Sequence, residues 1–137
     1  MLAAVLFMSV FAIGMASASP QDWAPEAVKA AFRKDYPNVS DQNVDWDKED
    51  GMYEAHFKVQ NEKMIVTYSP NGVLLATESE VSLSAVPEAV IKSVKNMHPN
   101  KKPTVYTKVV RGNGAVLYRN RTGGHNMLFT PEGAITK

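Results

Sequence analysis

Ala24-Pro25-Glu26-Ala27-Val28 opens a stretch of sequence that returns 62 residues later as Val86-Pro87-Glu88-Ala89-Val90. Two further segments recur in the same order. Tyr36-Pro37-Asn38 returns as His98-Pro99-Asn100 at the same offset, and Tyr68-Ser69-Pro70-Asn71-Gly72 returns as Phe129-Thr130-Pro131-Glu132-Gly133 at an offset of 61. Three matched segments in one order predict an internal duplication, in which each copy is one structural unit.

Each unit reads as a helix followed by three strands. Proline suits the first turn of a helix, and the residue before a proline avoids the helical region, so Pro25 and Pro37 bracket one helix and Pro87 and Pro99 another. Apolar residues then alternate with polar ones, as in 53–59 and 64–68, which is typical of half-buried antiparallel strands. Residues 74–76 are a candidate fourth or junction strand. The fold class expected is α+β: two tandem helix-plus-antiparallel-sheet units, with the helices packed on one face of a shared sheet.

The N-terminal segment has the features of an export signal. Residues 2–15 are apolar and uncharged, and Ala16-Ser17-Ala18 has the small residues that signal peptidase accepts. The run is too short to span a bilayer, which takes about 20 residues. We therefore expect a signal peptide at 1–18, a first repeat at 19–78, a linker at 79–85 and a second repeat at 86–137, together forming one compact domain. The mature protein would be periplasmic or secreted, without a membrane anchor.

Composition excludes several classes of protein. The 137 residues include no cysteine, so disulfide scaffolds, thiolate metal sites and cysteine nucleophiles are ruled out. The net charge of +1 disfavours a nucleic-acid binder. That near-neutral total conceals an asymmetry, because residues 24–78 hold 6 basic and 10 acidic residues whereas residues 79–137 hold 9 and 3. We expect an acidic protein partner to favour the second unit, with head-to-tail self-association as the competing outcome.

The sequence resembles a known family at its repeated segments and at Val44-Asp45-Trp46-Asp47-Lys48-Glu49-Asp50-Gly51-Met52-Tyr53-Glu54-Ala55-His56-Phe57. This pattern is similar to the PepSY-like family of exported bacterial proteins, which are also described as resembling β-lactamase inhibitor protein. The resemblance implies a tandem fold in the envelope and a binding or inhibitory role without catalysis. In the second unit Thr107 aligns with Trp46, and Gly114 with Tyr53, so that unit departs from the pattern.

The sequence contains no motif for catalysis or for a cofactor. It has no His-Glu-x-x-His, Gly-x-Ser-x-Gly or phosphate-binding glycine loop. His98 and His125 align with packing positions of the first unit. His56 is expected on the outward face with Glu54 and, across the sheet, Asp45, which makes a transition-metal site the weaker alternative. We expect a protein without enzymatic activity or cofactor.

The outward sheet face of the second unit is the candidate binding surface. It is expected to combine aromatic, aliphatic and arginine side chains, a composition typical of protein interfaces: Tyr106, Lys108, Val110, Leu117, Arg119 and Leu128. The alternative is that glycine-rich hairpins shift the strand register and place these residues in the core. Two functions therefore remain open. One is a protein-binding module that inhibits or chaperones an envelope or secreted enzyme, and the other is a binder of a small ligand or metal.

Overall fold

The computed structural model describes residues 24–102 and 104–137, so the expected signal peptide at 1–18 lies outside the described residues. The fold is α+β, as expected. The helices are α1 (Glu26–Asp35) and α2 (Glu88–Met97), with short 3-10 turns η1 (Asp41–Asn43) and η2 (Leu83–Ala85). The strands are β1 (Asp45–Glu49), β2 (Met52–Val59), β3 (Glu62–Tyr68), β4 (Leu74–Val81), β5 (Tyr106–Arg111), β6 (Val116–Thr122), β7 (His125–Phe129) and β8 (Ile135–Thr136).

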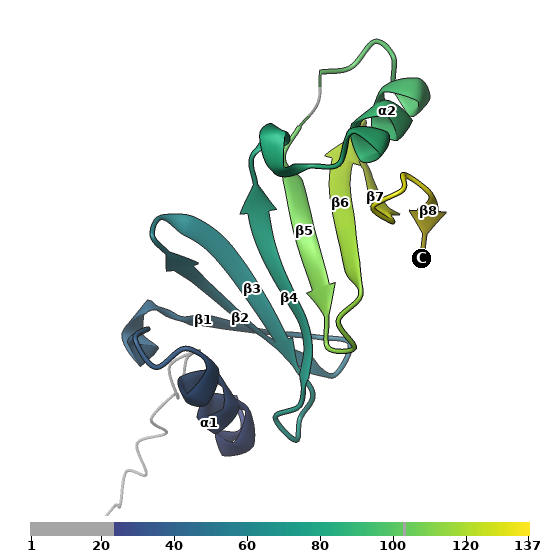
Figure 1. The fold of residues 1–137 in the computed structure, drawn as a ribbon. Coiled ribbons are helices and arrows are strands. Elements are labelled where there is room, and N and C mark those ends of the chain that lie inside the picture. The colour runs from purple at the N-terminus through teal and green to yellow at the C-terminus, as the bar shows by residue number, and fades with distance from the viewer. Residues whose placement is uncertain (1–23, 103) are drawn as a thin grey trace, which may run out of the picture.

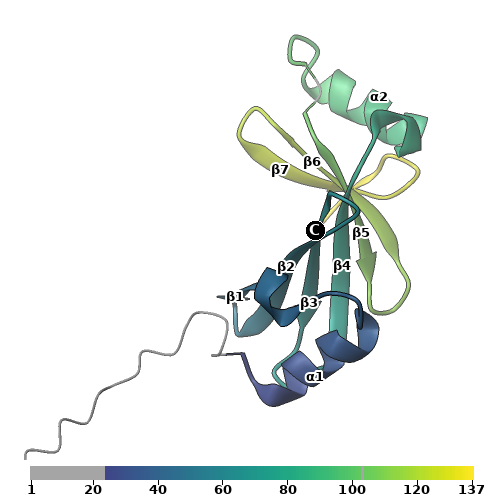
Figure 2. The same ribbon diagram turned by 90° about the vertical axis from the view of Figure 1, so that its left-hand side faces the viewer.

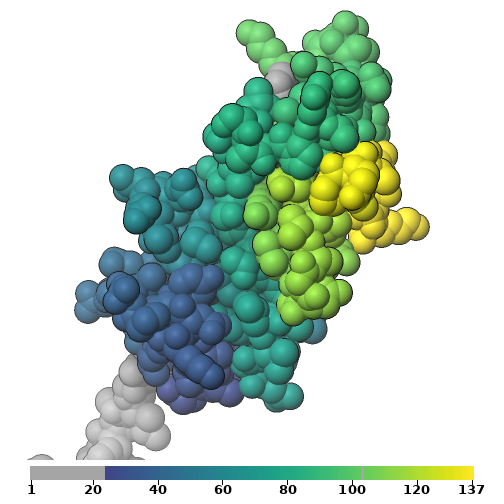
Figure 3. Space-filling view, in the orientation of Figure 1, coloured from purple at the N-terminus to yellow at the C-terminus, as the bar shows by residue number. Residues whose placement is uncertain are grey.

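The eight strands form one open antiparallel sheet, in the order in which they occur along the chain (Figure 1). The sheet twists strongly, so the strands near α2 cross those near α1 at a steep angle when seen from the side (Figure 2). Helix α1 lies at one end of the sheet and α2 at the other. The space-filling view shows the corresponding separation of the first part of the chain from the C-terminal part (Figure 3).

Both helices begin and end as the prolines predict. Helix α1 follows Pro25 and ends at Tyr36, whose N–H donates to the carbonyl of Phe32 at 2.8 Å. Helix α2 follows Pro87 and ends at His98, whose N–H donates to the carbonyl of Val94 at 2.9 Å. The proline after each end residue favours an extended conformation there, which stops the helix.

Both helices pack on the same face of the sheet. Val66, in the core under α1, pairs with Thr77 of β4. Every second residue of a strand lies on the same face, so Thr77 shares its face with Val81, which packs in the core under α2. Directly paired residues of antiparallel strands share a face. The opposite face, which we call the open face, therefore bears neither helix.

The core under α1 is aromatic. The Phe32 ring lies 5.0 Å from Phe57 and 5.6 Å from Trp46, measured between centroids, and Tyr36 lies 4.8 Å from Phe57. Edge-to-face contacts of this kind add to the hydrophobic gain from burial. At the edge of this cluster the fully buried Tyr68 donates a hydrogen bond from its hydroxyl to Asp35, with an oxygen–oxygen distance of 2.9 Å.

The expected register of β5 is wrong by one residue. Tyr106 pairs with Asn120, and Lys108 pairs with Tyr118, whose ring packs in the core under α2. Tyr106, Lys108 and Val110 therefore lie on the helix-covered face and not on the outward face. A slip of one residue moves every side chain of a strand to the other face, because the side-chain period is two.

The slip arises because the connections between matching strands differ in length between the two halves of the chain. Trp46 pairs with Ala55 and Tyr53 pairs with Tyr68, whereas Tyr106 pairs with Asn120 and Tyr118 pairs with Phe129. Matching Tyr68 to Phe129 thus makes Tyr106 correspond to Trp46 and Tyr118 to Tyr53, in place of Thr107 and Gly114. Aromatic residues are kept at both positions. Trp46 lies eight residues after Asn38, but Tyr106 lies only six after Asn100, so the loop before β5 is two residues shorter and not one. That difference moves β5 by one position.

The strand count also differs from expectation. Residues 74–76, expected as a short fourth or junction strand, are the start of an eight-residue strand that runs into the segment expected as a linker. A further short strand, β8, follows the turn at Pro131-Glu132-Gly133. Four strands therefore follow each helix, and β4 and β5 are hydrogen-bonded neighbours at the middle of the sheet.

Candidate functional site

The open face is the side of the sheet that neither helix covers. The strand pairings place on it a continuous row of side chains that crosses from β2 to β7: His56, Ile65, Glu78, Val109, Thr107, Leu117, Arg119 and Leu128. Three of the six expected binding residues, Leu117, Arg119 and Leu128, are on this face, and the other three are not.

A hollow of about 570 Å³ lies on the open face. It extends from β1 to β6, and most of its lining residues are polar or charged, with Phe57, Met64 and Ile65 as the large apolar ones. Its charged members are three basic residues, Lys58, Lys63 and Arg119, and three acidic residues, Asp45, Glu78 and Glu80. The formal charges of this lining therefore cancel, so the hollow itself does not share the positive excess of residues 79–137.

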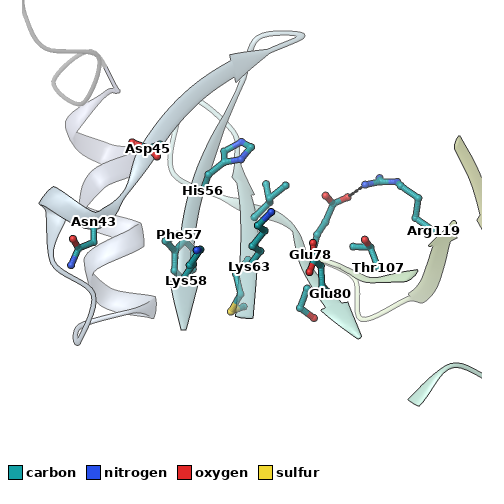
Figure 4. A pocket seen from close by; sticks show the side chains of 13 residues that line it. Asn43, Asp45, His56, Phe57, Lys58, Lys63, Glu78, Glu80, Thr107 and Arg119 are labelled. Carbon is teal, nitrogen blue, oxygen red and sulfur yellow. Dashed lines mark ion pairs between the residues drawn. The ribbon is translucent and has the colours of Figure 1, made fainter. Parts of the chain in front are cut away.

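An ion pair between Glu78 and Arg119 lies at the β6 side of this hollow (Figure 4). Glu78 on β4 and Arg119 on β6 belong to strands that both pair with β5, and Nη1 of Arg119 is 2.5 Å from Oε1 of Glu78. The Glu78 side chain is 13% exposed and that of Arg119 is 37% exposed. The carboxylate is thus largely removed from water, while the guanidinium keeps an accessible side for another group.

Acidic residues and a histidine gather at the far side of the face. Nε2 of His56 is 3.1 Å from Oε2 of Glu54, and one ligand atom each of Asp47, Glu54 and His56 lie within 4.8 Å of one another. Of the expected metal ligands, His56 and Glu54 are brought together, and Asp47 completes the group in place of Asp45. Asp45 lies opposite His56 in the strand register but is not part of this group.

The expected binding residues differ in how accessible they are. Tyr106 is only 2% exposed, and this burial raises the pKa of its hydroxyl above the usual value. Leu117 is 7% exposed although it lies on the open face. Arg119 and Leu128 are half-buried and lie on the open face, so they are the expected residues that a partner there could contact.

Sequence reasoning missed Glu78, Ile65 and Thr107, which line the hollow. Glu78 lies in a segment without a clear strand signal, because Thr77 and Ser79 on the helix-covered face are polar and do not alternate with it as apolar residues would. Thr107 was missed because the one-residue slip of β5 placed it in the core.

Comparison with known proteins shows the fold. No family model and no curated protein matches the chain. A candidate periplasmic protein from Bacteroides eggerthii matches with a TM-score of 0.73 and 21% identity, over 84% of this chain and 87% of the other. A DUF2874 family protein from Bacteroides uniformis matches with a TM-score of 0.72 and 23% identity, over 84% and 88%.

A BLIP-like protein from Bacteroides fragilis is a further structural neighbour, with a TM-score of 0.59 and 21% identity, over 82% of this chain and 84% of the other. The chain thus has the fold of the DUF2874 and BLIP-like proteins. In the part of the chain that the structure describes, no helix is both long and apolar enough to cross a membrane.

Proposed function

We propose that the protein is a non-catalytic, exported binding module that holds another envelope or secreted protein against its open face, as an inhibitor or a chaperone. The observation that carries this proposal is that both helices lie on one face of the sheet, leaving the hollow around Glu78 and Arg119 uncovered. A sheet with one free face presents a broad surface to a partner. Arginine is also enriched among the residues that dominate binding energy in protein interfaces.

The structural neighbours support this proposal at the level of fold and place of action. One is described as BLIP-like and another as a candidate periplasmic protein. Export through a signal peptide at 1–18 agrees with them. The PepSY-like resemblance in the sequence points in the same direction.

Two tandem repeats, at 19–78 and 86–137, are part of the proposal. Gly72 approaches α1 so closely that a Cβ would be 2.5 Å from the carbonyl oxygen of Ala27, and Gly133 approaches α2 with a Cβ 2.6 Å from that of Ala89. The same turn therefore meets the same point of each helix. A duplicated unit explains this correspondence, with residues 79–85 as the connection.

The partner is expected to be acidic on the side that meets the second repeat, where basic residues are in excess. Opposed charges on the two repeats also allow head-to-tail self-association. Sedimentation at low and high salt separates these outcomes. Self-association appears as larger species of the purified protein at low salt that dissociate at high salt, whereas a purely partner-directed surface leaves a monomer at both.

Capture from envelope extract tests the binding face. Arg119→Glu and Lys63→Glu reverse charges at the hollow, and Lys95→Glu is the matched control, because Lys95 is exposed on the outer side of α2. The proposal predicts loss of about tenfold or more in capture for Arg119→Glu, as for interface residues that dominate binding, and normal capture for Lys95→Glu. Equal capture by all three variants contradicts the proposal.

A metal-binding role is the second candidate, favoured by the grouping of Asp47, Glu54 and His56. Two carboxylates and an imidazole form a donor set that suits Zn²⁺. Calorimetry with zinc tests it, with His56→Gln to remove the imidazole and His125→Gln, an exposed histidine elsewhere, as the control. Binding that His56→Gln abolishes and His125→Gln leaves intact supports the role. No heat and no shift in melting temperature contradict it.

A further inference from the structure

The core under α2 differs from the core under α1 at matching positions. Strand pairing makes Asn120 correspond to Ala55, Thr122 to Phe57 and Tyr106 to Trp46. The end of α2 carries His98 where α1 carries Tyr36. An aromatic cluster in the first half is thus replaced by a set of polar side chains in the second.

Three of these four side chains are buried, and the set includes several unpaired atoms. Asn120 is 0% exposed, Thr122 2% and Tyr106 2%. Nδ2 of Asn120, the hydroxyl of Tyr106 and Nε2 of His98 are buried atoms without a hydrogen-bond partner among residues 24–102 and 104–137. Buried polar atoms in folded proteins nearly always have a hydrogen-bond partner, so three unpaired atoms in one core indicate an additional hydrogen-bonding group.

Strand pairing and the turn at Gly123 place the three side chains in one part of this core. Tyr106 and Asn120 are direct cross-strand neighbours on the face that α2 covers. Thr122 donates from its hydroxyl to Oδ1 of Asn120 at 2.5 Å, which leaves the amide nitrogen of Asn120 as the free end. The turn at Gly123 brings His98 to the same strand end, because a Cβ there would be 3.5 Å from Cε1 of His98.

We propose that α2, β5 and β6 enclose a binding site for a small neutral hydrogen-bonding guest, and that this guest is ordered water. Buried water typically makes about three hydrogen bonds to polar groups that lack other partners, and the three unpaired atoms supply that number. An anion is disfavoured because His98 ends α2, where the helix dipole is negative. A cation is disfavoured because the unpaired atom of Asn120 is a hydrogen-bond donor and that of Tyr106 is a hydroxyl. The positive charge of Lys101 also lies near this end of the strand, since its Nζ would be 3.0 Å from a Cβ built on Gly123.

This site is independent of partner binding on the open face, since it lies on the other side of the sheet. Transfer of magnetisation from water to the side-chain amide protons of Asn120, measured by NMR on the purified protein, tests it. The expected result is a cross-peak with the sign of a long-lived bound water, at Asn120 and at the Nε2 proton of His98.

Two asparagine variants and a second measurement complete the test. Asn120→Ala, which installs the residue found at the matching position 55, should remove the water cross-peak at His98. The matched control Asn126→Ala changes an exposed asparagine and should leave the cross-peaks at Asn120 and His98 intact. A folded protein with no such cross-peak overturns the proposal, as does native mass spectrometry that finds a retained small molecule in place of water. The first measurement needs no variant, so it decides the matter even if Asn120→Ala fails to fold.

Discussion

Arg119 on β6 and Glu78 on β4 form an ion pair that spans β5, with 2.5 Å between Nη1 and Oε1. The pair joins the middle of the sheet to its second half on the open face. Because the Glu78 side chain is only 13% exposed, its carboxylate has little water to replace the guanidinium if Arg119 is removed.

Arg119→Ala should therefore destabilise the protein. Leaving a largely buried carboxylate unpaired costs about 1–3 kcal/mol. Chemical denaturation measures this loss, and Glu78→Gln in the same chain should recover part of it by removing the unpaired charge. Lys92→Ala is the control, since Lys92 and Glu88 are 69% and 81% exposed and such pairs contribute about 0–1 kcal/mol. Similar losses for both arginine and lysine variants would show that the Glu78–Arg119 pair has no special role.

Gly72→Ala and Gly133→Ala should each destabilise by more than strain at the glycine alone explains. Both have positive φ, +82° and +86°, and a Cβ at either would clash with a helix carbonyl. Gly114→Ala is the matched control, because its φ is +87° but no atom lies within 4 Å of its Cβ. Backbone strain of this kind costs about 1–3 kcal/mol, so the control reports that part. Thermal unfolding should rank Gly114→Ala as the mildest variant, and equal losses at the three sites would contradict the close approach of turn to helix.

The unfolding free energy should fall at alkaline pH because of Tyr68. Burial, followed by the hydrogen bond to Asp35, raises the pKa of Tyr68 in the folded state far above its unfolded value. A raised folded pKa means that the stabilisation is complete below the unfolded pKa of about 10 and is lost as pH rises beyond it. The loss per tyrosine is about 1.4 kcal/mol per pH unit. Burial also raises the pKa of Tyr36 and of Tyr106, which adds to the slope.

Denaturation of the native protein and of Tyr68→Phe between pH 9 and about pH 11 measures this effect, in the range where tyrosines of the unfolded chain ionise. The variant should be less stable at neutral pH by about 1–2 kcal/mol, since it loses the hydrogen bond to Asp35. Its stability should then decline less steeply above pH 10. Parallel curves for the two proteins would mean that Tyr68 ionises equally in the folded and unfolded states.

The periodic parts of the sequence predicted the fold class and the face on which each helix packs. Proline acts locally, so Pro25, Pro37, Pro87 and Pro99 bracket the helices. The alternation over 53–59 in β2 and 64–68 in β3 is interrupted only at Ile65. The register of β5 could not be obtained in this way. It depends on the loop at 100–105, which is two residues shorter than its counterpart before β1, and nothing in the loop sequence indicates how many positions are lost.

The candidate site was predicted only in part for the same reason. Leu128 precedes Phe129 directly, and Arg119 pairs with Leu128. The Pro-Glu-Gly turn anchors this register, so the face predicted for both residues is correct. Tyr106 was placed wrongly because β5 was aligned through the loop at 100–105. Its partner Asn120 is a buried polar residue, and a polar residue in a strand predicts exposure unless the opposing residue is known.

The central claim is that the open face binds a protein, and site-specific photo-crosslinking in the native envelope tests it most directly. A photoreactive phenylalanine derivative replaces Lys63, which is exposed and lines the hollow, or Lys95, which is exposed on the outer side of α2. The proposed function predicts a discrete crosslinked adduct from position 63, lost when Arg119→Glu is added, and none from position 95. An adduct from position 95 alone, or one from position 63 that Arg119→Glu leaves unchanged, would contradict it.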